Sequence, residues 1–148
     1  MKTLLLDRTT WDLTKDGLGN IALASNPYSI TQDVASAART FRAECWYDKT
    51  LGLPYWESIL GHSPPLGFLK AQYVSAARSV PEVAGARVFL AGYDVDRLLT
   101  GQIQVTTTSG ITTVLTLGGP NRRGSGVADT SINILVDAFG NAARGLQR

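Results

Sequence analysis

Hydrophobic residues follow two different periods along this chain of 148 residues, first helical and then strand-like. In residues 30–43 and 66–79 the apolar positions recur every three or four residues, as on one face of a helix. The first stripe is Ile30, Val34, Ala37, Ala38 and Phe41, and the second is Leu66, Leu69, Tyr73, Val74 and Ala77. We expect two amphipathic helices that cover a core, with Asp33, Ser36 and Arg39 of the first helix pointing away from it.

Several residues at the ends of these segments are typical of helix termini. Ser29 stands three residues before Gln32, the spacing of a capping box in which each side chain bonds the other residue's backbone N–H. Pro64-Pro65 interrupts regular structure before the second helix. Between the two helices, Pro54 is expected to open a short helix over residues 54–60, with Gly61 at its end because glycine adopts left-handed backbone at little cost.

After Val80-Pro81-Glu82-Val83 the pattern becomes that of strands. Residues 86–93, 98–107 and 111–117 are rich in β-branched and aromatic residues, and the segments Asp94-Val95-Asp96 and Ser109-Gly110 separate them as turns. Three such segments in succession predict an antiparallel meander on which the two helices can bury their stripes. The expected fold class is therefore α+β, with a small, mainly antiparallel sheet.

The first 25 residues predict a hairpin. A short apolar run at residues 3–6 comes first, and Trp11, Leu13, Ile21 and Leu23 then flank the turn-forming sequence of residues 15–20. The acidic residues of this turn raise the question of calcium. However, Asp12, Asp16 and Asn20 lack the alternate-residue spacing and the terminal Glu of an EF-hand loop, which favours ordinary turn residues.

The chain divides into three parts by composition. Residues 1–117 are expected to form a single α+β domain, and residues 118–128 form a Gly-rich segment that is typical of a flexible linker. In residues 129–148 the apolar positions fit a helical stripe, while residues 131–136 also alternate as a strand would. Both readings stay open, and so does the question of whether this segment packs on its own domain or on another subunit.

Charge and cysteine content exclude several classes of protein. The formal net charge is +2 with a pI near 8.8, but the basic residues are dispersed, so we expect no nucleic-acid surface. Cys45 is the single cysteine, which is consistent with a reducing compartment, and we expect it to be a buried small apolar residue. The three leucines near the amino terminus are too few for a signal peptide or a membrane span, so the chain is expected to stay in the cytoplasm where it is made.

The most distinctive segment of the chain runs from residue 44 to residue 61, and we call it the aromatic loop. Its eighteen positions contain four aromatic residues, two glycines and a proline, and neither a helical nor a strand period fits them. An irregular segment of this kind needs its own side chains to offset the entropy of ordering it. We expect a structured loop whose key residues are Glu44, Trp46, Tyr47, Gly52, Pro54, Tyr55, Trp56 and Gly61.

Around this loop an ordered set of motifs extends over roughly residues 3–107. The motifs are Leu4-Leu5-Leu6-Asp7, Trp11-Asp12-Leu13, Asp16-Gly17-Leu18-Gly19-Asn20-Ile21, Gln32-Asp33-Val34, the loop itself, Val80-Pro81-Glu82-Val83 and the segment from Leu98 to Val105. In this order and spacing, the chain resembles the baseplate wedge and sheath-initiator family of contractile phage tails, which is historically labelled lysozyme-like and has relatives in type VI secretion and tailocin machines. Relatives commonly carry Gly where this chain has Ala43.

The resemblance implies a structural assembly protein and not an enzyme. Such a protein sits in multiple copies around the tail tube and helps to nucleate the sheath, with other wedge proteins, the sheath and the tube as its partners. The aromatic loop would hold the helices in register and present aromatic residues to a neighbour, while residues 98–117 or the C-terminal segment would allow strand addition. The implied location is the tail baseplate of a virion assembled in the host cytoplasm, without cofactor, metal, nucleic acid or membrane.

The lysozyme-like label raises an alternative function as a peptidoglycan-cleaving enzyme. A glycosidase needs two carboxyl groups roughly 5 to 10 Å apart, one of them shielded from water so that it serves as the acid. Glu44 beside Trp46 is the candidate acid, with Asp48 or Glu57 as its partner. A carboxylate in an aromatic loop is more often an acceptor for backbone N–H groups, so we expect a structural role for Glu44.

Other chemistries have fewer residues to support them. His62 is the single histidine, and no Gly-x-Ser-x-Gly elbow accompanies it, so we expect a cap or surface residue. One Cys, one His and the absence of a Walker-type loop leave no set of ligands for a metal or phosphate group. A third hypothesis is a free-standing protein- or ligand-binding module that belongs to no larger machine.

Overall fold

The computed structural model describes residues 1–7, 10–62, 64–93, 99–117 and 132–133. Its main sheet has four antiparallel strands in the order β3-β4-β5-β6. These strands are β3 (Val83–Tyr93), β4 (Leu99–Thr107), β5 (Thr112–Leu117) and the two-residue β6 (Ile132–Asn133). The expected meander and the α+β class are confirmed.

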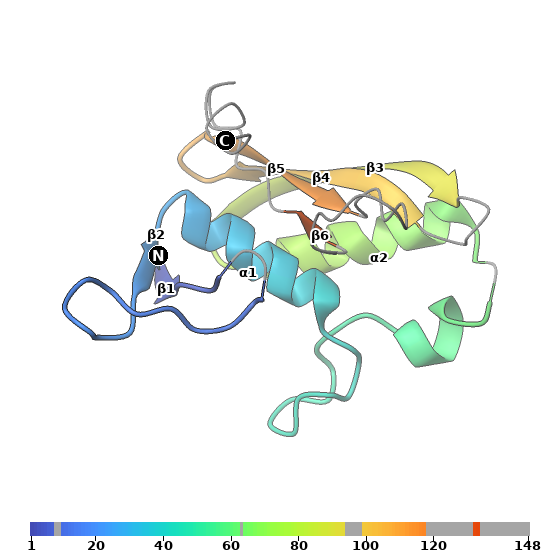
Figure 1. The fold of residues 1–148 in the computed structure, drawn as a ribbon. Coiled ribbons are helices and arrows are strands. Elements are labelled where there is room, and N and C mark those ends of the chain that lie inside the picture. Colours follow the sequence, from blue (N-terminus) through green and yellow to red (C-terminus); the bar gives the residue numbers. More distant parts are fainter. Residues whose placement is uncertain (8–9, 63, 94–98, 118–131, 134–148) are drawn as a thin grey trace, which may run out of the picture.

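Two helices, α1 (Tyr28–Arg39) and α2 (Leu66–Arg78), lie on the same side of this sheet (Figure 1). The second helix follows the predicted boundaries closely, and Leu69, Tyr73 and Ala77 of its predicted stripe are buried. Helix α2 contacts mainly β3, whereas α1 contacts α2 and β5. Between α1 and the sheet, the Thr31 hydroxyl donates a buried hydrogen bond of 2.9 Å to the Thr113 hydroxyl.

The core forms where the inward side chains of neighbouring strands stand in rows. Because Val88, Ile103 and Leu115 are partners in the strand register, their side chains lie side by side under the helices. Ile103 and Leu115 are fully buried and join Ile30, Val34 and Leu69 of the helices in one cluster. The outward row of Phe89, Gln102 and Thr116 alternates with these positions, as the pleat requires.

The first 25 residues form an arm in which β1 (Lys2–Leu4) pairs with β2 (Leu23–Ser25). The predicted hairpin is confirmed, although it is more folded than expected. At its centre, three backbone groups form a closed ring: the N–H of Leu5 donates to Ala22, that of Ala22 to Thr14, and that of Thr14 to Leu5, over 2.9 to 3.3 Å. These backbone hydrogen bonds hold three neighbouring segments of the arm together.

The arm is fastened to α1 by Gln32, which is 1% exposed. The Gln32 side-chain amide donates to the Leu4 carbonyl at 2.7 Å and accepts from the Leu6 N–H at 2.9 Å, as a neighbouring strand would. The predicted capping box is therefore wrong: Pro27 occupies the N-cap position, and the Ser29 hydroxyl bonds Met1 and Asn26 instead. Gln32 thus bonds the backbone of a segment distant in sequence instead of capping its own helix.

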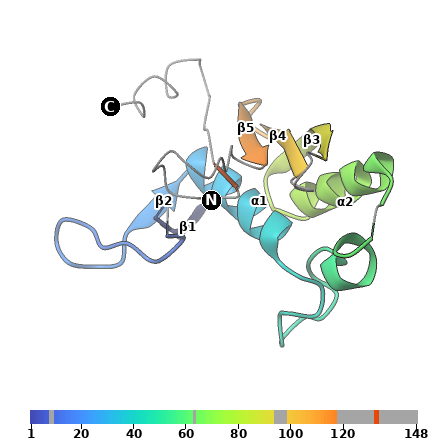
Figure 2. The same cartoon turned by 45° about the vertical axis from the view of Figure 1, so that its right-hand side comes forward.

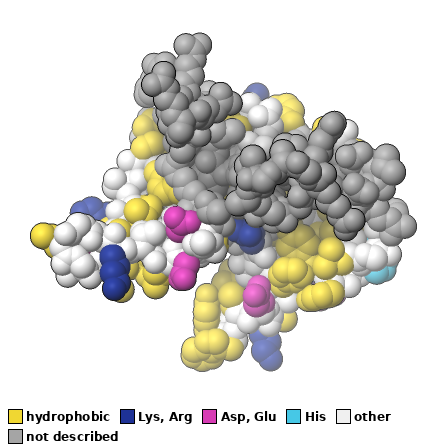
Figure 3. All heavy atoms as spheres, in the orientation of Figure 1, with side chains coloured by type: hydrophobic (Ala, Val, Ile, Leu, Met, Phe, Trp, Pro, Cys, Tyr) yellow, Lys and Arg dark blue, Asp and Glu magenta, His cyan; other side chains and the backbone are white. Residues whose placement is uncertain are grey.

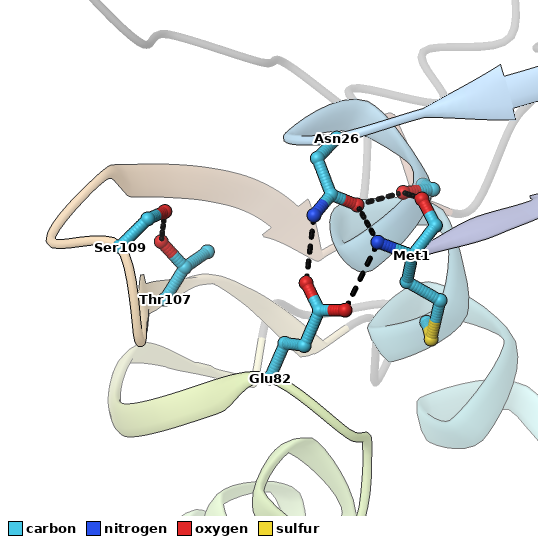
Figure 4. A network of polar contacts seen from close by, with 6 residues as sticks. Met1, Asn26, Glu82, Thr107 and Ser109 are labelled. Carbon is cyan, nitrogen blue, oxygen red and sulfur yellow. Dashed lines mark hydrogen bonds and ion pairs between the residues drawn. The ribbon is translucent and has the colours of Figure 1, made fainter.

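Glu82 joins the arm to the turn between α2 and β3 (Figure 4). Its carboxylate lies 2.9 Å from the Met1 ammonium and accepts a hydrogen bond of 2.6 Å from the Asn26 amide. The ammonium and then the amide hold the pKa of this carboxyl below its usual value. The Glu82 carbonyl also accepts from the Thr108 N–H of the β4–β5 turn, so one residue contacts three parts of the chain.

The first helix ends earlier than predicted. It was expected to reach residue 43 but ends at Arg39, and Phe41 forms a parallel bridge with Leu53 instead of continuing the helical stripe. Arg39 does not point into solvent, since its guanidinium lies 4.9 Å from the centre of the Trp11 ring. Tertiary pairing with Leu53 overrides the helical periodicity at this point.

Parts of the C-terminal prediction can be compared with the structure. Ile132 and Asn133 pair with Leu117 and Thr116 of the chain's own sheet. The predicted turn at residues 94–96, the linker at 118–128 and the rest of the C-terminal segment lie outside the described residues, so their conformation and packing remain predictions. The turn at Ser109-Gly110 is present, and Gly110 has a φ of +81°.

Candidate functional site

The base of the aromatic loop is closed by backbone pairing. The Leu53 N–H donates to the Thr40 carbonyl at 2.9 Å, and the Arg42 N–H donates to the Leu53 carbonyl at 2.8 Å. Leu53 itself is 1% exposed and belongs to the core. Gly52 approaches the Phe41 backbone so closely that an added Cβ would stand 2.6 Å from the Phe41 carbonyl carbon. This predicted key residue is therefore glycine for a steric reason.

Two acidic residues stabilise turns within the loop. The Glu44 carboxylate accepts a hydrogen bond of 2.9 Å from the Phe41 N–H, as expected for a structural role. The Asp48 carboxylate accepts from the N–H and hydroxyl of Thr50 at 2.9 and 2.6 Å, and these bonds hold its pKa below the usual value. Ala43, just before Glu44, has a φ of +65°, which an alanine adopts at a cost.

Tyr55 anchors the second half of the loop. The predicted short helix is present as a single π-helical turn, Tyr55–Ile59, after the buried Pro54, and it ends near Gly61, whose φ is +75°. The Tyr55 hydroxyl donates to the Ala38 carbonyl at the end of α1 and lies 3.3 Å from the Tyr73 hydroxyl of α2. This side chain therefore connects both helices, and the register role expected of the loop stays a prediction.

The other three aromatic residues of the loop are exposed. Trp46 is 86% exposed, Trp56 73% and Tyr47 68%. Trp46 and Tyr47 stack edge to face with ring centres 5.8 Å apart, whereas Trp56 leans on Phe41 at 5.4 Å. Hydrophobic side chains gather over the projecting loop at the lower edge of the molecule in Figure 3. Leu53, Tyr55 and backbone pairing hold the loop, in line with the expectation that its own side chains order it, while Trp46, Tyr47 and Trp56 protrude.

Two hollows lie beside the loop. A shallow groove of about 470 Å³ is lined by Phe41, Arg42, Ala43, Glu44 and Trp56. A second hollow of about 260 Å³ lies between the loop and α2, where Cys45 and Tyr47 face Gln72, Ser75 and Ser79. Cys45 was expected to be buried but is half-buried at this hollow. The combination of a groove with protruding aromatic side chains is typical of a surface that binds another protein.

Of the residues considered for catalysis, Glu44 lines the groove and Glu57 contacts Arg42, which lines it as well. Glu44 is exposed, and Glu57, its candidate partner, is exposed and forms an ion pair of 3.4 Å with Arg42. His62 is exposed as well, and its Nδ1 lies 3.0 Å from the Leu60 carbonyl oxygen. Within the part of the chain that the structure describes, no group of three or more His, Cys, Asp or Glu side chains is placed to hold a metal ion.

A second exposed apolar surface lies on the N-terminal arm, and the sequence analysis missed it. Leu4, Leu13, Ile21 and Leu23 are between 45% and 60% exposed, although all four were considered ordinary hairpin residues. A signal for this existed in the sequence. Apolar residues occupy both alternate positions of the segment 21–24, whereas a half-buried strand usually carries polar residues on its outer face.

Comparisons with known proteins add no support to the family resemblance, which rests on the motifs alone. No model of a protein family matches the chain, and no curated protein matches it either. Among the described helices, none combines the length and the apolar character that crossing a membrane requires.

Proposed function

We propose that this protein is a structural component of a contractile-tail baseplate, a wedge or sheath initiator that acts through protein–protein contacts. The observation that carries the proposal is the aromatic loop, a rigidly closed segment that exposes Trp46, Tyr47 and Trp56. Aromatic residues of this kind supply much of the binding energy at protein interfaces. The ordered motifs shared with the baseplate family support the same reading.

The rigidity of the loop matters for this function. Its base is fixed by Leu53 and Gly52, and Tyr55 connects it to both helices. Because the backbone is already ordered in the free chain, a partner that covers the aromatic side chains does not have to offset the entropy of ordering the loop. The conformation thus favours a preformed docking surface in which Glu44 acts by fixing the turn beside Phe41.

Strand addition to a sheath subunit needs a free sheet edge. The segment 98–117 was expected to provide one. Its first strand, β4, lies between β3 and β5 and its backbone is already paired on both sides, so within this segment β5 is the candidate. Among the described residues, β4 is the only strand that pairs with β3, which leaves the other edge of β3 unpaired. At the opposite end of the sheet, β5 pairs with β6 only at Thr116 and Leu117. We therefore assign strand addition to the outer edge of β3 or to Thr112–Leu115 of β5.

The proposal is tested by replacing the loop residues in cells that produce the complete tail. Trp56→Ala and Glu44→Ala are expected to block tail assembly, and Trp46→Ala tests the most exposed aromatic side chain of the loop without removing a core contact. Arg78→Ala, at the end of α2, serves as the control because Arg78 is exposed and belongs neither to the loop nor to a sheet edge. Normal incorporation of the loop variants into contractile tails would contradict the proposal.

The alternative proposal is a peptidoglycan-cleaving enzyme with Glu44 as its acid. One observation favours it: Glu44 and Trp56 line the same groove, and an aromatic face beside a carboxyl group suits a sugar ring. The exposure of Glu44 favours the structural role, because a catalytic acid is usually shielded from water. Turnover of purified cell wall that is abolished by Glu44→Gln, with the fold intact, would establish the enzyme instead.

A further inference from the structure

The two outer strands of the main sheet differ in how their edges are protected. Figure 2 shows the three long strands in a row, with β3 at one end and β5 at the other. The register between β3 and β4 is interrupted twice, because Ala84 and Ala91 are extra residues on the β3 side, and β3 also carries the exposed Arg87. Bulges and charges are the usual protection of a strand edge that stays open in solvent.

The edge of β5 has no such protection. Its register with β4 runs without interruption from Thr112 to Leu117, and the stretch Thr112–Leu115 contains neither a charged residue nor a proline. Thr113 and Leu115 are fully buried on the inner face, and Val114 is half-buried on the outer one. A regular, uncharged edge of this kind pairs readily with any free strand. We therefore expect a strand that covers it.

The short strand β6 sets the register for the residues that follow it. Ile132 pairs with Leu117 and Asn133 pairs with Thr116, in antiparallel fashion. If this register continues, each later residue of the chain faces the residue one position earlier in β5. The further partners are then Ile134 with Leu115, Leu135 with Val114, Val136 with Thr113 and Asp137 with Thr112. The extended strand would end where β5 begins.

The residue types of this segment fit the two faces of the sheet. In the continued register, the buried positions of β5 face only apolar, β-branched residues, namely Ile132, Ile134 and Val136. On the outer face, Asn133 and Asp137 face threonines, and Leu135 faces the half-buried Val114. A shift by one residue would turn Asn133 and Asp137 to the buried face, which is costly for polar groups. The pattern therefore favours this register over its neighbours.

We propose that residues 134–137, which follow β6 and lie outside the described residues, dock on Thr112–Leu115 of the same chain and extend β6 to residues 132–137. Because Ile132 and Asn133 are already paired, each further residue has to advance only about 3.3 Å along the edge. A strand from another molecule would also lose translational freedom, so the chain's own residues are favoured. A closed β5 leaves the outer edge of β3 for a partner's strand, a consequence that rests on the proposed function.

The first test is disulfide formation in the full chain, with Cys45→Ser to remove the native thiol. Val114→Cys and Leu135→Cys place two thiols opposite each other on the outer face, and diamide is expected to join them within one chain. Mass spectrometry and a non-reducing gel identify the product. The matched control, Val114→Cys with Ile134→Cys, places the thiols on opposite faces of the sheet and should oxidise at least about tenfold more slowly.

Hydrogen exchange provides a second test that needs no new disulfide. Val136→Asp places a charge at an inward position, so the amides of Thr112–Leu115 should exchange at least about tenfold faster than in the wild type. Leu135→Asp, its matched control, places the same charge on the outer face and should change these rates by less than about threefold. Circular dichroism establishes that both variants are folded.

Three outcomes overturn the inference. They are a Val114–Leu135 cysteine pair that oxidises no faster than its control, a disulfide that joins two chains instead of one, and amides of Thr112–Leu115 that exchange equally fast in the wild type and in Val136→Asp. The proposed function can fail separately. Assembled tails that lack the chain would refute the baseplate role and leave the docking intact, whereas a failed disulfide would refute the docking and leave the baseplate role intact.

Discussion

Gly52 lies against the backbone of Phe41 with no space for a side chain. A Cβ at this position would be 2.6 Å from both the carbonyl carbon and the carbonyl oxygen of Phe41, and its φ of +92° is one that other residues rarely adopt. This contact lies at the base of the aromatic loop, next to the backbone hydrogen bonds of Leu53 that close it. The shape of the candidate interface therefore depends on a residue that belongs to its base.

We predict that Gly52→Ala destabilises the protein by about 3 kcal/mol or more, because both the close contact and the left-handed backbone oppose a side chain. Chemical denaturation measures the free energy of unfolding. Gly61→Ala is the matched control: Gly61 also has a positive φ but faces open space, so it should cost only about 1 kcal/mol. Equal losses for the two variants would show that the Phe41 contact is unimportant.

Ala43 has a positive φ, as Gly52 does, but it carries a side chain. Its φ of +65° places an alanine in the left-handed region, which glycine adopts at less cost. We predict that Ala43→Gly stabilises the protein by about 1 kcal/mol through the relief of this strain, although glycine also makes the unfolded chain more flexible. Thermal denaturation of the two proteins measures the change. A lower midpoint for Ala43→Gly would contradict the prediction.

Tyr55 makes stability depend on alkaline pH. Burial, and then the neighbouring Tyr73, raise the pKa of Tyr55 well above its usual value of 10.0. Above pH 10 the unfolded chain loses the phenol proton and the folded chain keeps it, so stability falls as pH rises, by up to about 1.4 kcal/mol per pH unit. Below that pH this contribution is constant.

Tyr55→Phe isolates this effect. At neutral pH the variant should lose about 1 kcal/mol with the hydrogen bond to Ala38. Because phenylalanine has no proton to lose, this disadvantage should shrink above pH 10 and then reverse. Urea denaturation of both proteins between pH 7 and pH 11.5 provides the comparison. Parallel pH profiles would contradict the burial of an un-ionised Tyr55 hydroxyl.

Gln32 is predicted to be the main link between the arm and α1. Gln32→Ala removes two hydrogen bonds and leaves the Leu4 carbonyl and the Leu6 N–H without that partner, so we expect a loss of about 2 to 4 kcal/mol. Hydrogen exchange should show a matching loss of protection in residues 2–6 and 22–25. Unchanged protection of the arm after this substitution would mean that other contacts hold it in place.

Regular elements could be predicted from the sequence because their side-chain periods are local. The α2 stripe of Leu69, Tyr73 and Ala77 and the alternation of Ile103 and Val105 in β4 both record a single buried face. Each prediction needed only the neighbours in sequence. The α+β class and the order of the three long strands followed from the same patterns.

The failures all involve partners far apart in sequence. The side chain of Gln32 bonds residues 4 and 6 instead of capping its own helix, and Phe41 pairs with Leu53 instead of extending α1. Local spacing cannot reveal such competition. The presentation of loop aromatics was expected from the family resemblance, but composition alone does not show which of the four protrude, and the structure shows that Trp46 and Trp56 do. Exposure depends on tertiary geometry.

The most direct test of the baseplate role is cryo-electron microscopy of particles from cells that produce the whole tail gene cluster. We predict density for this chain in a ring between the baseplate and the first sheath layer, with Trp46 and Trp56 covered by a neighbouring subunit. Assembled tails that contain no copy of the chain would contradict it, and so would copies whose aromatic loop remains in solvent.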